Sequence, residues 1–232
     1  MEKKKKLVVL SGAGMSAESG LKTFREMGGL WEQYEVTEVA TPEAWGKNPE
    51  LVMRFYNERR KQLLEVHPNP GHYGLAELEK FYDVHIITQN VDDLHERAGS
   101  TRILHLHGEL RKARSTGDSL LVYEIDGWEL NLGDKCEKGY QLRPHIVWFG
   151  EAVPNIEKAI SIVKEANFLV IIGTSMQVYP AAGLMYYAEA GTPKFVIDPN
   201  DTSADFDERI TYIKMGASKG VKKLRELLIA HP

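Results

Sequence analysis

The sequence predicts an α/β fold: a Rossmann-type parallel sheet with helices on both faces, plus a smaller lobe formed by two insertions. Short apolar runs with the length of buried strands lie at 7–10, 84–87, 168–172 and 195–197. Helical patterns separate these runs, as in the stretch 156–166, where apolar residues recur every three or four positions. Strands that alternate with helices are typical of parallel βαβ units.

Two stretches break this alternation and predict the insertions. The first, about 25–70, is helical, and its long run 50–66 follows an N-cap, Asn48, and a proline at the first helical position, Pro49. The second, about 111–142, holds short apolar pieces between glycines. We expect it to pack through Leu120, Leu121, Tyr123, Trp128 and Leu130. The remaining ranges, about 1–24, 71–110 and 143–232, would form the Rossmann lobe of a single domain over residues 1–232.

Composition and charge exclude several classes of protein. The 232 residues carry 29 basic and 33 acidic side chains, a net charge of −4. The pI of 6.1 gives no general attraction to nucleic acid or to an acidic membrane, and the apolar runs are far shorter than the roughly 20 residues of a membrane-spanning helix. A single cysteine, Cys136, excludes an intrachain disulfide and agrees with a reducing compartment. We therefore expect a cytoplasmic protein with no nucleic-acid and no membrane partner.

Three polar motifs lie near the predicted strand ends. The glycine-rich loop 11–20 would let backbone amides approach a phosphate, although it could equally be a structural turn. The segment 88–92 lies where a parallel strand meets the ligand crevice, but Asp92 could instead cap a helix. His105 and His107 share a face if their segment is extended. Either could be a general base or half of a metal site, yet two histidines cannot fill a zinc site.

Together with two further segments, these motifs strongly resemble the sirtuin family of NAD-dependent protein-lysine deacylases. The order and spacing match across almost the whole chain, in the segments 12–21 with 23–25, 88–92, 107–108, 143–151 and 173–175. Five motifs in the right order are far more specific than any one of them. The resemblance implies one sirtuin-type catalytic domain that uses NAD and acts on acyl-lysine proteins or peptides.

The resemblance also implies the catalytic residues. In this family the acyl oxygen of a modified lysine attacks the nicotinamide ribose and nicotinamide leaves. A histidine then acts as base toward the ribose hydroxyls, and free lysine and 2′-O-acyl-ADP-ribose result. By motif position that base would be His107, with Asn90 and Asp92 holding the ribose and the nicotinamide amide. His105 would be its structural neighbour.

A larger set of residues would bind NAD by the same resemblance. The loop 12–20 would meet the pyrophosphate, and residues 173–175 would contact the adenosine. Phe24 and Arg25 would lie in the loop that shields the reactive sugar from water. The expected cofactor-binding residues are Gly12, Ala13, Gly14, Ser16, Glu18, Thr23, Phe24, Arg25, Trp31, Gln89, Asn90, Asp92, Gly173, Thr174, Ser175, Asp198, Asn200 and Ala217.

An acidic acyl group is expected from the helix of the first insertion. Tyr56 and Arg59 are three residues apart, so both lie on one helix face, where a hydroxyl beside a guanidinium would receive a carboxylate. This Y-x-x-R pattern resembles the class III sirtuin branch that prefers malonyl-, succinyl- or glutaryl-lysine. Ala40 stands where that branch has a small residue that widens the acyl pocket. Two ordinary residues on a solvated helix are the alternative interpretation.

The peptide is expected at the segment 147–151, which matches the family's extended segment that pairs with substrate backbone by strand addition. Its expected substrate-binding residues are Val147, Phe149, Gly150 and Glu151, whereas Trp148 fits an ordinary buried position.

One departure from the family pattern concerns zinc. Most sirtuins hold a structural zinc with two C-x-x-C pairs, but this region offers only Cys136, and the first pair would fall at 113–116. We therefore predict that structural zinc is absent. The expected function is NAD-dependent lysine deacylation, with succinyl and malonyl groups preferred over acetyl. The alternatives are mono-ADP-ribosyl transfer, a non-catalytic NAD or ADP-ribose sensor, and a metal hydrolase built on the two histidines.

Overall fold

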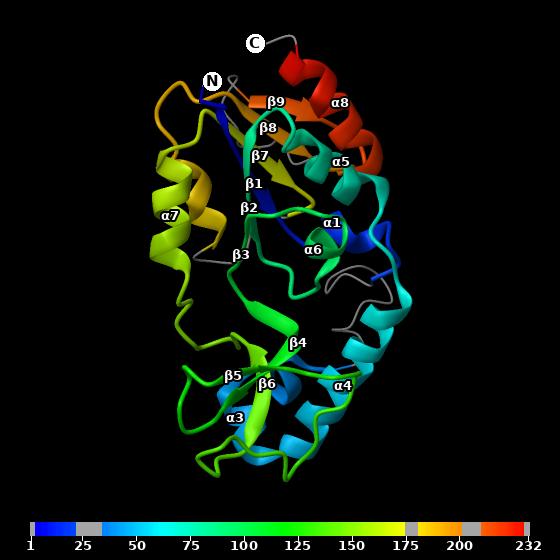
Figure 1. The fold of residues 1–232 in the computed structure, drawn as a ribbon, viewed down its shortest axis with the longest axis vertical. Helices are drawn as coiled ribbons and strands as arrows, with labels where there is room; N and C mark the ends of the chain where they lie inside the picture. Colours follow the sequence, from blue (N-terminus) through cyan, green and yellow to red (C-terminus); the bar gives the residue numbers. More distant parts are fainter. Residues whose placement is uncertain (1–2, 22–33, 175–180, 201–209, 230–232) are drawn as a thin grey trace.

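The computed structural model describes residues 3–21, 34–174, 181–200 and 210–229. Its larger lobe is built on a six-stranded, fully parallel sheet in the order β3-β2-β1-β7-β8-β9 (Figure 1). The strands are β1 Lys6–Ser11, β2 Asp83–Thr88, β3 Ile103–His105, β7 Phe168–Ile172, β8 Lys194–Ile197 and β9 Ile210–Ile213. The predicted α/β class and its four central strands are confirmed, whereas the two edge strands, β3 and β9, were not predicted.

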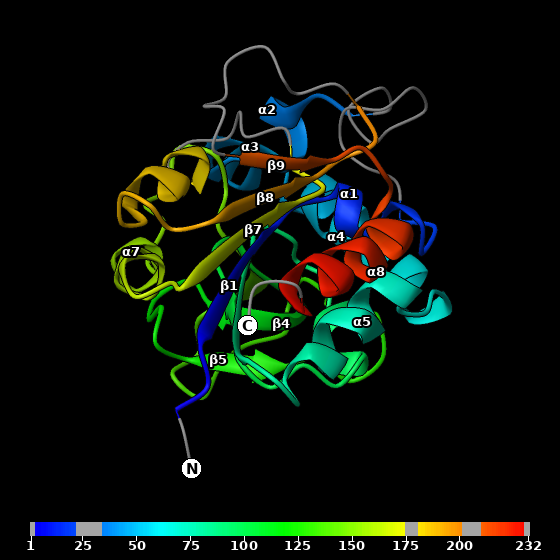
Figure 2. The same cartoon turned by 90° about the horizontal axis from the view of Figure 1, so that it is seen from above.

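Helices cover both faces of this sheet, as the view from above shows (Figure 2). On one face, α5 Pro70–Leu78 and α8 Ala217–Ile229 pack over Leu7 and Val9 of β1. On the other face, α7 Ile156–Lys164 and the 3₁₀-helix Ala181–Tyr187 pack over Val8 and Leu10. Successive side chains of a strand point to opposite faces, so the continuous apolar sequence of β1 fills two cores. No helix that the structure describes is both long and apolar enough to cross a membrane.

The smaller lobe lies beyond the carboxyl ends of β1 and β2 (Figure 1). It comprises the helices α2 Val36–Val39, α3 Pro42–Lys47 and α4 Pro49–Glu65, and an antiparallel sheet of order β5-β4-β6. The strands of this sheet are β4 Gly108–Ser115, β5 Val122–Glu124 and β6 Leu142–Ile146. The sheet therefore begins and ends a few residues outside the range 111–142. At the start of α4 the Asn48 side chain accepts a hydrogen bond from the Leu51 amide at 3.1 Å, which confirms the predicted cap.

The second insertion packs through a different set of residues from the expected one. Its core consists of Ala113, Ile125 and Leu130 against Met53 of α4. Leu120 is 88% exposed, so the expectation that it packs inside is wrong. It lies in a turn before β5, where the Asp118 side chain accepts a hydrogen bond from its amide and the leucine side chain points to solvent.

Hydrogen bonds from two α4 side chains, Arg60 and Asn57, add to the apolar packing of this lobe. Arg60 is fully buried, and its guanidinium donates to the carbonyls of Leu110 and Trp128, both at 2.6 Å. Asn57 exchanges two hydrogen bonds with the backbone of Leu130. Because the carbonyl groups come from strand β4 and from the loop after β5, these side chains hold the antiparallel sheet to the helix.

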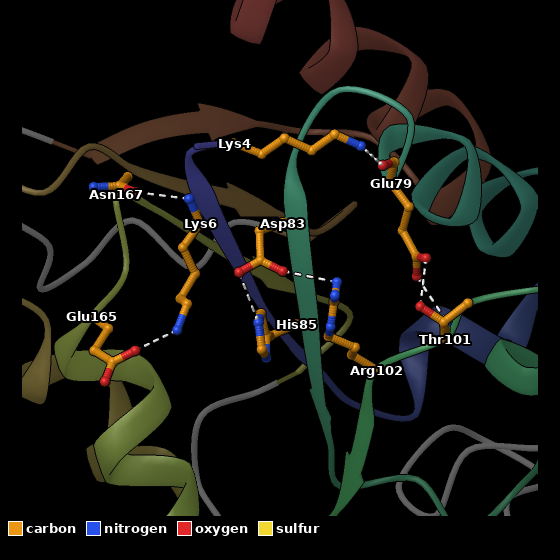
Figure 3. Close-up of polar contacts among 9 residues, drawn as sticks. All are labelled: Lys4, Lys6, Glu79, Asp83, His85, Thr101, Arg102, Glu165 and Asn167. Carbon is orange, nitrogen blue, oxygen red and sulfur yellow. Dashed lines mark hydrogen bonds and ion pairs between the residues drawn. The ribbon is translucent and has the colours of Figure 1, made fainter. Parts of the chain in front are cut away.

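At the amino ends of the parallel strands, ion pairs and hydrogen bonds connect the loops (Figure 3). Asp83 at the start of β2 pairs with Arg102 at 2.8 Å and with His85 at 3.2 Å. The Lys6 ammonium pairs with Glu165, while the Lys6 amide donates to the Asn167 side chain at 2.7 Å. These contacts attach the loops at this end to the strands of the sheet.

Two buried histidines pack against each other, His72 on α5 and His95 on the short helix α6 Leu94–Arg97. His72 and His95 are 0% and 1% exposed, and their ring centroids are 4.9 Å apart. Nδ1 of His72 accepts a hydrogen bond from the Asn69 amide at 3.2 Å and so completes a capping box at the start of α5. Burial lowers the pKa of His72 to about 4, and that of His95 well below its ordinary value.

These lowered pKa values predict acid sensitivity. Each of these histidines has a higher pKa in the unfolded chain than in the folded protein. The contribution of the neutral rings to the unfolding free energy is therefore fully present above about pH 6.5 and is lost as the pH falls toward the pKa of the folded state. We expect His72→Gln, which keeps a capping-box side chain but does not titrate, to remove part of this loss. Wild-type protein should lose about 2 kcal/mol more than the variant in unfolding free energy between about pH 7 and about pH 5. Urea denaturation at both pH values measures it, and equal losses would contradict the prediction. His105, whose pKa is raised, works in the opposite direction but is present in both proteins.

Candidate active site

The turns after β1 and β7 touch each other through their backbones. The Gly12 amide donates to the carbonyl of Ile172 at 3.0 Å, and the Gly14 amide donates to that of Gly173 at 2.8 Å. A Cβ at Gly12 would lie 2.7 Å from the Thr174 Cβ. At Gly173, where φ is +59°, a Cβ would lie 2.2 Å from the Met15 amide nitrogen. Only glycines allow this approach, and we call the resulting pair of packed turns the glycine cradle. It lies at the carboxyl end of the sheet, the edge at which open parallel sheets bind ligands.

Buried polar side chains connect this cradle to the end of β2. The Asn90 amide group donates to the Gly12 carbonyl and to the Ser16 hydroxyl, both at 3.1 Å. Ser16 in turn donates to the Asp92 carboxylate at 2.9 Å, and the Leu94 amide donates to the other carboxylate oxygen at 3.2 Å. Burial raises the pKa of Asp92, and these two hydrogen bonds oppose the rise. The N-cap of the following helix, Leu94–Arg97, is Asp93, without a side-chain cap. The helix-capping interpretation of Asp92 is therefore wrong, and its two oxygens accept from Leu94 and Ser16 instead.

His107 follows β3 with one ring nitrogen fixed. Its Nδ1 lies 3.1 Å from the carbonyl oxygen of Gln89. A carbonyl can only accept, so Nδ1 carries the hydrogen and Nε2 is the basic nitrogen of the neutral ring. Burial lowers the pKa of His107, which keeps the ring neutral at neutral pH. His107 therefore has the tautomer and charge of a general base.

His105 is arranged differently. Nδ1 lies 3.0 Å from the Asn90 carbonyl and Nε2 lies 2.8 Å from the Glu96 carboxylate. Burial opposes protonation, yet the hydrogen bond and charge of Glu96 raise the pKa of His105. Strand β3 ends at His105, so the two histidines do not share an extended face as expected. Among the residues that the structure describes, no three His, Cys, Asp or Glu side chains are grouped to hold a metal ion.

Arg59 of α4 faces the same cavity as Asn90 and Asp92. The cavity is also lined by Ala13, Ser16, Leu21, Gln62, Leu63, Gln89, Val91 and Leu110. Burial lowers the pKa of Arg59, and the nearby Tyr56 and Asp92 oppose that shift. Gln62 was missed in the sequence, although its position one helical turn after Arg59 was a usable signal. Tyr56 is buried beside this cavity and is not part of its described lining.

The segment 147–151 is hydrogen-bonded to the backbone of both His107 and Ala40. The Val147 amide donates to the His107 carbonyl at 2.9 Å, and the Phe149 amide donates to the Ala40 carbonyl at 3.0 Å. Phe149 is 51% exposed, and Gly150 is exposed with φ +90°.

The Glu151 carboxylate, in contrast, is already bonded within the protein. It accepts from Arg114 at 2.9 Å, from Arg143 at 2.8 Å and from the Trp148 amide at 2.8 Å. We therefore interpret Glu151 as holding the segment rather than contacting a ligand.

The other expected cofactor residues lie farther along the sheet edge or outside the described structure. Gln89 donates to the Thr174 hydroxyl at 3.1 Å and so joins the cradle. Glu18 accepts from the Ser218 amide at 3.3 Å, next to Ala217 at the start of α8. The Asp198 side chain accepts from the Asn200 amide at 2.8 Å. None of Glu18, Ala217, Asp198 and Asn200 is in the described lining of the Arg59 cavity. Outside the described residues lie Thr23, Phe24, Arg25, Trp31 and Ser175.

Known proteins resemble this chain over nearly its whole length. Residues 12–180 match the model of the Sir2 family. An NAD-dependent protein deacylase of Bacteroides thetaiotaomicron is 55% identical, over 98% of this chain and 100% of its own. One of Helicobacter pylori is 57% identical, over 97% of this chain and 98% of its own.

Solved structures agree with these sequence matches. A Sir2 homologue in complex with NAD superposes with a TM-score of 0.85 at 39% identity, covering 97% of this chain and 91% of that one. A mutant Sir2 homologue with 2′-O-acetyl-ADP-ribose gives a TM-score of 0.85 at 38% identity, covering 97% and 94% of the two chains.

The glycine cradle predicts a position-specific cost for one added methyl group. Gly173→Ala places a Cβ against backbone, whereas Gly127→Ala adds one at φ +72° with nothing within 4 Å. Both variants carry the strain of a positive φ. We expect Gly173→Ala to be about 1–3 kcal/mol less stable than Gly127→Ala, because only the first overlaps its neighbours. Urea denaturation of both variants measures the difference, and equal stabilities would show that the two turns can separate at little cost.

Proposed function

The chain belongs to the Sir2 family and is an NAD-dependent protein deacylase, and we propose that it prefers lysines whose acyl group ends in a carboxylate. Succinyl- and malonyl-lysine would be better substrates than acetyl-lysine. The observation that carries this proposal is the position of Arg59. Arg59 lines the cavity that also holds Asn90 and Asp92, so a positive charge lies at the pocket in which the acyl transfer is expected.

The residues present fit NAD. The glycine cradle of Gly12, Gly14 and Gly173 has no room for a Cβ because its two turns pack on each other. It lies at the carboxyl end of the parallel sheet, where dinucleotides bind in folds of this class. Asn90 and Asp92 are held rigid by the Ser16 hydroxyl, and we assign them to the nicotinamide end. When bound, NAD supplies the ribose carbon that accepts the acyl oxygen as nicotinamide leaves.

His107 would be the general base of the reaction. The hydrogen bond to Gln89 fixes its tautomer, so that Nε2 can take a proton from a ribose hydroxyl without rearrangement. The lowered pKa of His107 keeps this nitrogen unprotonated at neutral pH. The buried His105, with both ring nitrogens hydrogen-bonded, would hold the backbone at Asn90.

The peptide substrate would pair with the segment 147–151 as an added strand. This segment is anchored at both sides, to His107 and to Ala40, and the exposed Phe149 offers an apolar contact. An acyl-lysine entering beside it would reach toward Arg59 and the helix α4.

One finer point belongs to this proposal. We infer that the small lobe holds without structural zinc, because its one cysteine, Cys136, donates to the Ser115 hydroxyl at 3.3 Å and the Arg60 and Asn57 hydrogen bonds supply the attachment to α4. The zinc content of the protein used in the assay below tests this point. Neither mono-ADP-ribosyl transfer nor a sensor role gains a specific observation from the structure.

Product analysis with matched peptides tests the acyl preference. We expect release of succinyl groups only with NAD, yielding O-succinyl-ADP-ribose, and a kcat/KM above that for acetyl-lysine. Arg59→Met should lower the succinyl value by about ten- to hundredfold, as expected for loss of charge-assisted hydrogen bonds. Arg54→Met is the matched control, because Arg54 is an exposed arginine on the same helix. Mass spectrometry and initial rates give both values, and full desuccinylase activity in Arg59→Met would refute the role of Arg59.

A second variant separates an enzyme from a sensor. Asparagine at 107 can still donate to the Gln89 carbonyl, but it has no basic nitrogen. His107→Asn should therefore lower kcat by about 10²–10⁴-fold while NAD still binds. Calorimetric titration with NAD and turnover of the same preparation give the two readouts. Unchanged turnover would remove His107 as the base, and a wild-type protein that binds NAD without turnover would favour the sensor.

A further inference from the structure

We propose that Trp148 is a positioning residue for acyl specificity, which orients the Tyr56 hydroxyl so that its hydrogen is available to an acyl carboxylate. This inference rests on the proposed preference for acidic acyl groups. It assigns a function to a residue that the sequence left as an ordinary buried aromatic.

The first step is the direction of one hydrogen bond. Nε1 of Trp148 lies 3.0 Å from the hydroxyl oxygen of Tyr56, and both side chains are buried. An indole N–H can only donate, so the tyrosine oxygen must be the acceptor. The phenol keeps its own hydrogen, and the structure shows no acceptor for it among the described residues. Buried donors normally find a partner, and a ligand carboxylate would be one.

The second step is the place of that hydroxyl. Tyr56 is packed among Val39, Ala40 and Phe55 in the small-lobe core. Arg59 follows it by three residues on α4, so the two side chains are neighbours on the helix surface. Burial raises the pKa of Tyr56 to about 12, so the hydroxyl stays neutral and able to donate at neutral pH. A carboxylate held by Arg59 would thus meet a second donor beside it.

The third step is the rigidity of the indole. The Arg143 guanidinium carbon lies 3.4 Å from the centroid of the Trp148 ring, and the Trp45 ring lies 5.9 Å away. Arg143 is itself held by two hydrogen bonds of 2.8 Å to Glu151, and Glu151 also accepts from the Trp148 amide. The indole therefore cannot turn away from Tyr56 without breaking this arrangement. The same residue joins the segment expected to hold the peptide to the helix expected to hold the acyl group.

Trp148→Phe removes the N–H and keeps an aromatic ring for Arg143 to stack on. We expect the ratio of succinyl to acetyl kcat/KM to fall by about three- to tenfold, carried by KM, as for one lost neutral hydrogen bond. Trp45→Phe is the matched control, since it removes an indole from the same aromatic pair but no bond to Tyr56. A double-mutant cycle adds Tyr56→Phe. If Trp148 acts through Tyr56, Trp148→Phe has no further effect on the ratio in that background, and an additive effect overturns the proposal.

A measurement on the wild-type protein covers the case in which Trp148→Phe does not fold. The indole N–H signal of Trp148 in a ¹⁵N-labelled spectrum, assigned by removing the other three tryptophans singly, should shift more with a succinyl-lysine peptide than with the acetyl-lysine peptide, both with NAD. Equal shifts with the two peptides would overturn the proposal that Trp148 orients the Tyr56 hydroxyl. Failure of the proposed function looks different, because Arg59→Met would then leave the succinyl rate unchanged. An unchanged ratio in folded Trp148→Phe, with Arg59→Met impaired, rejects only the role of Trp148.

Discussion

The structure depends on the direct backbone contact between the turns that follow β1 and β7. Those strands are neighbours at the centre of the parallel sheet, and the Gly14 amide bonds to the Gly173 carbonyl at 2.8 Å where they end. A parallel sheet brings all its carboxyl ends to one edge, and the absence of side chains at this point lets two loops share it. The Asn90 side chain, which follows β2, donates a hydrogen bond to the Gly12 carbonyl. The ends of three adjacent strands are therefore fixed relative to one another before any ligand binds.

From this edge, a continuous path of contacts leads into the small lobe. His107 bonds to Gln89 through its side chain and to Val147 through its carbonyl, and the next residue, Trp148, bonds to Tyr56 of α4. His107, the segment 147–151 and helix α4 are thus linked by hydrogen bonds. Such preorganisation lowers the entropy that binding must overcome. The buried guanidinium groups of Arg60 and Arg143 are likewise hydrogen-bonded, to backbone carbonyls and, for Arg143, also to Glu151.

The four central strands and the start of α4 could be predicted because their signals are local: continuous apolar runs for the strands, and Asn48 with Pro49 for the helix. The edge strands β3 and β9 carry three and four residues and owe their conformation to a neighbouring strand, which no local pattern shows. At the site, the motifs identified the residues that converge at the sheet edge. The hydrogen bond of Trp148 and the ion cluster of Glu151 could not be predicted, because residues far apart in sequence meet there. The packing prediction for Leu120 was wrong for a different reason, because the sequence of a turn does not show whether an apolar side chain points to the core or to solvent.

The central place of β1 has a consequence for biosynthesis. Val9 pairs with Val170, so during synthesis β1 lacks one of its two neighbours until the roughly 160 residues between them have been added. At roughly 5–20 residues per second, that interval is on the order of ten seconds or more. During this time an apolar strand with an open edge is a target for chaperones and for misassociation. The glycine cradle needs Gly173 as well as Gly14, so a nascent chain stalled before β7 has the glycine-rich sequence 11–20 but lacks the carbonyl of Gly173 to which Gly14 bonds.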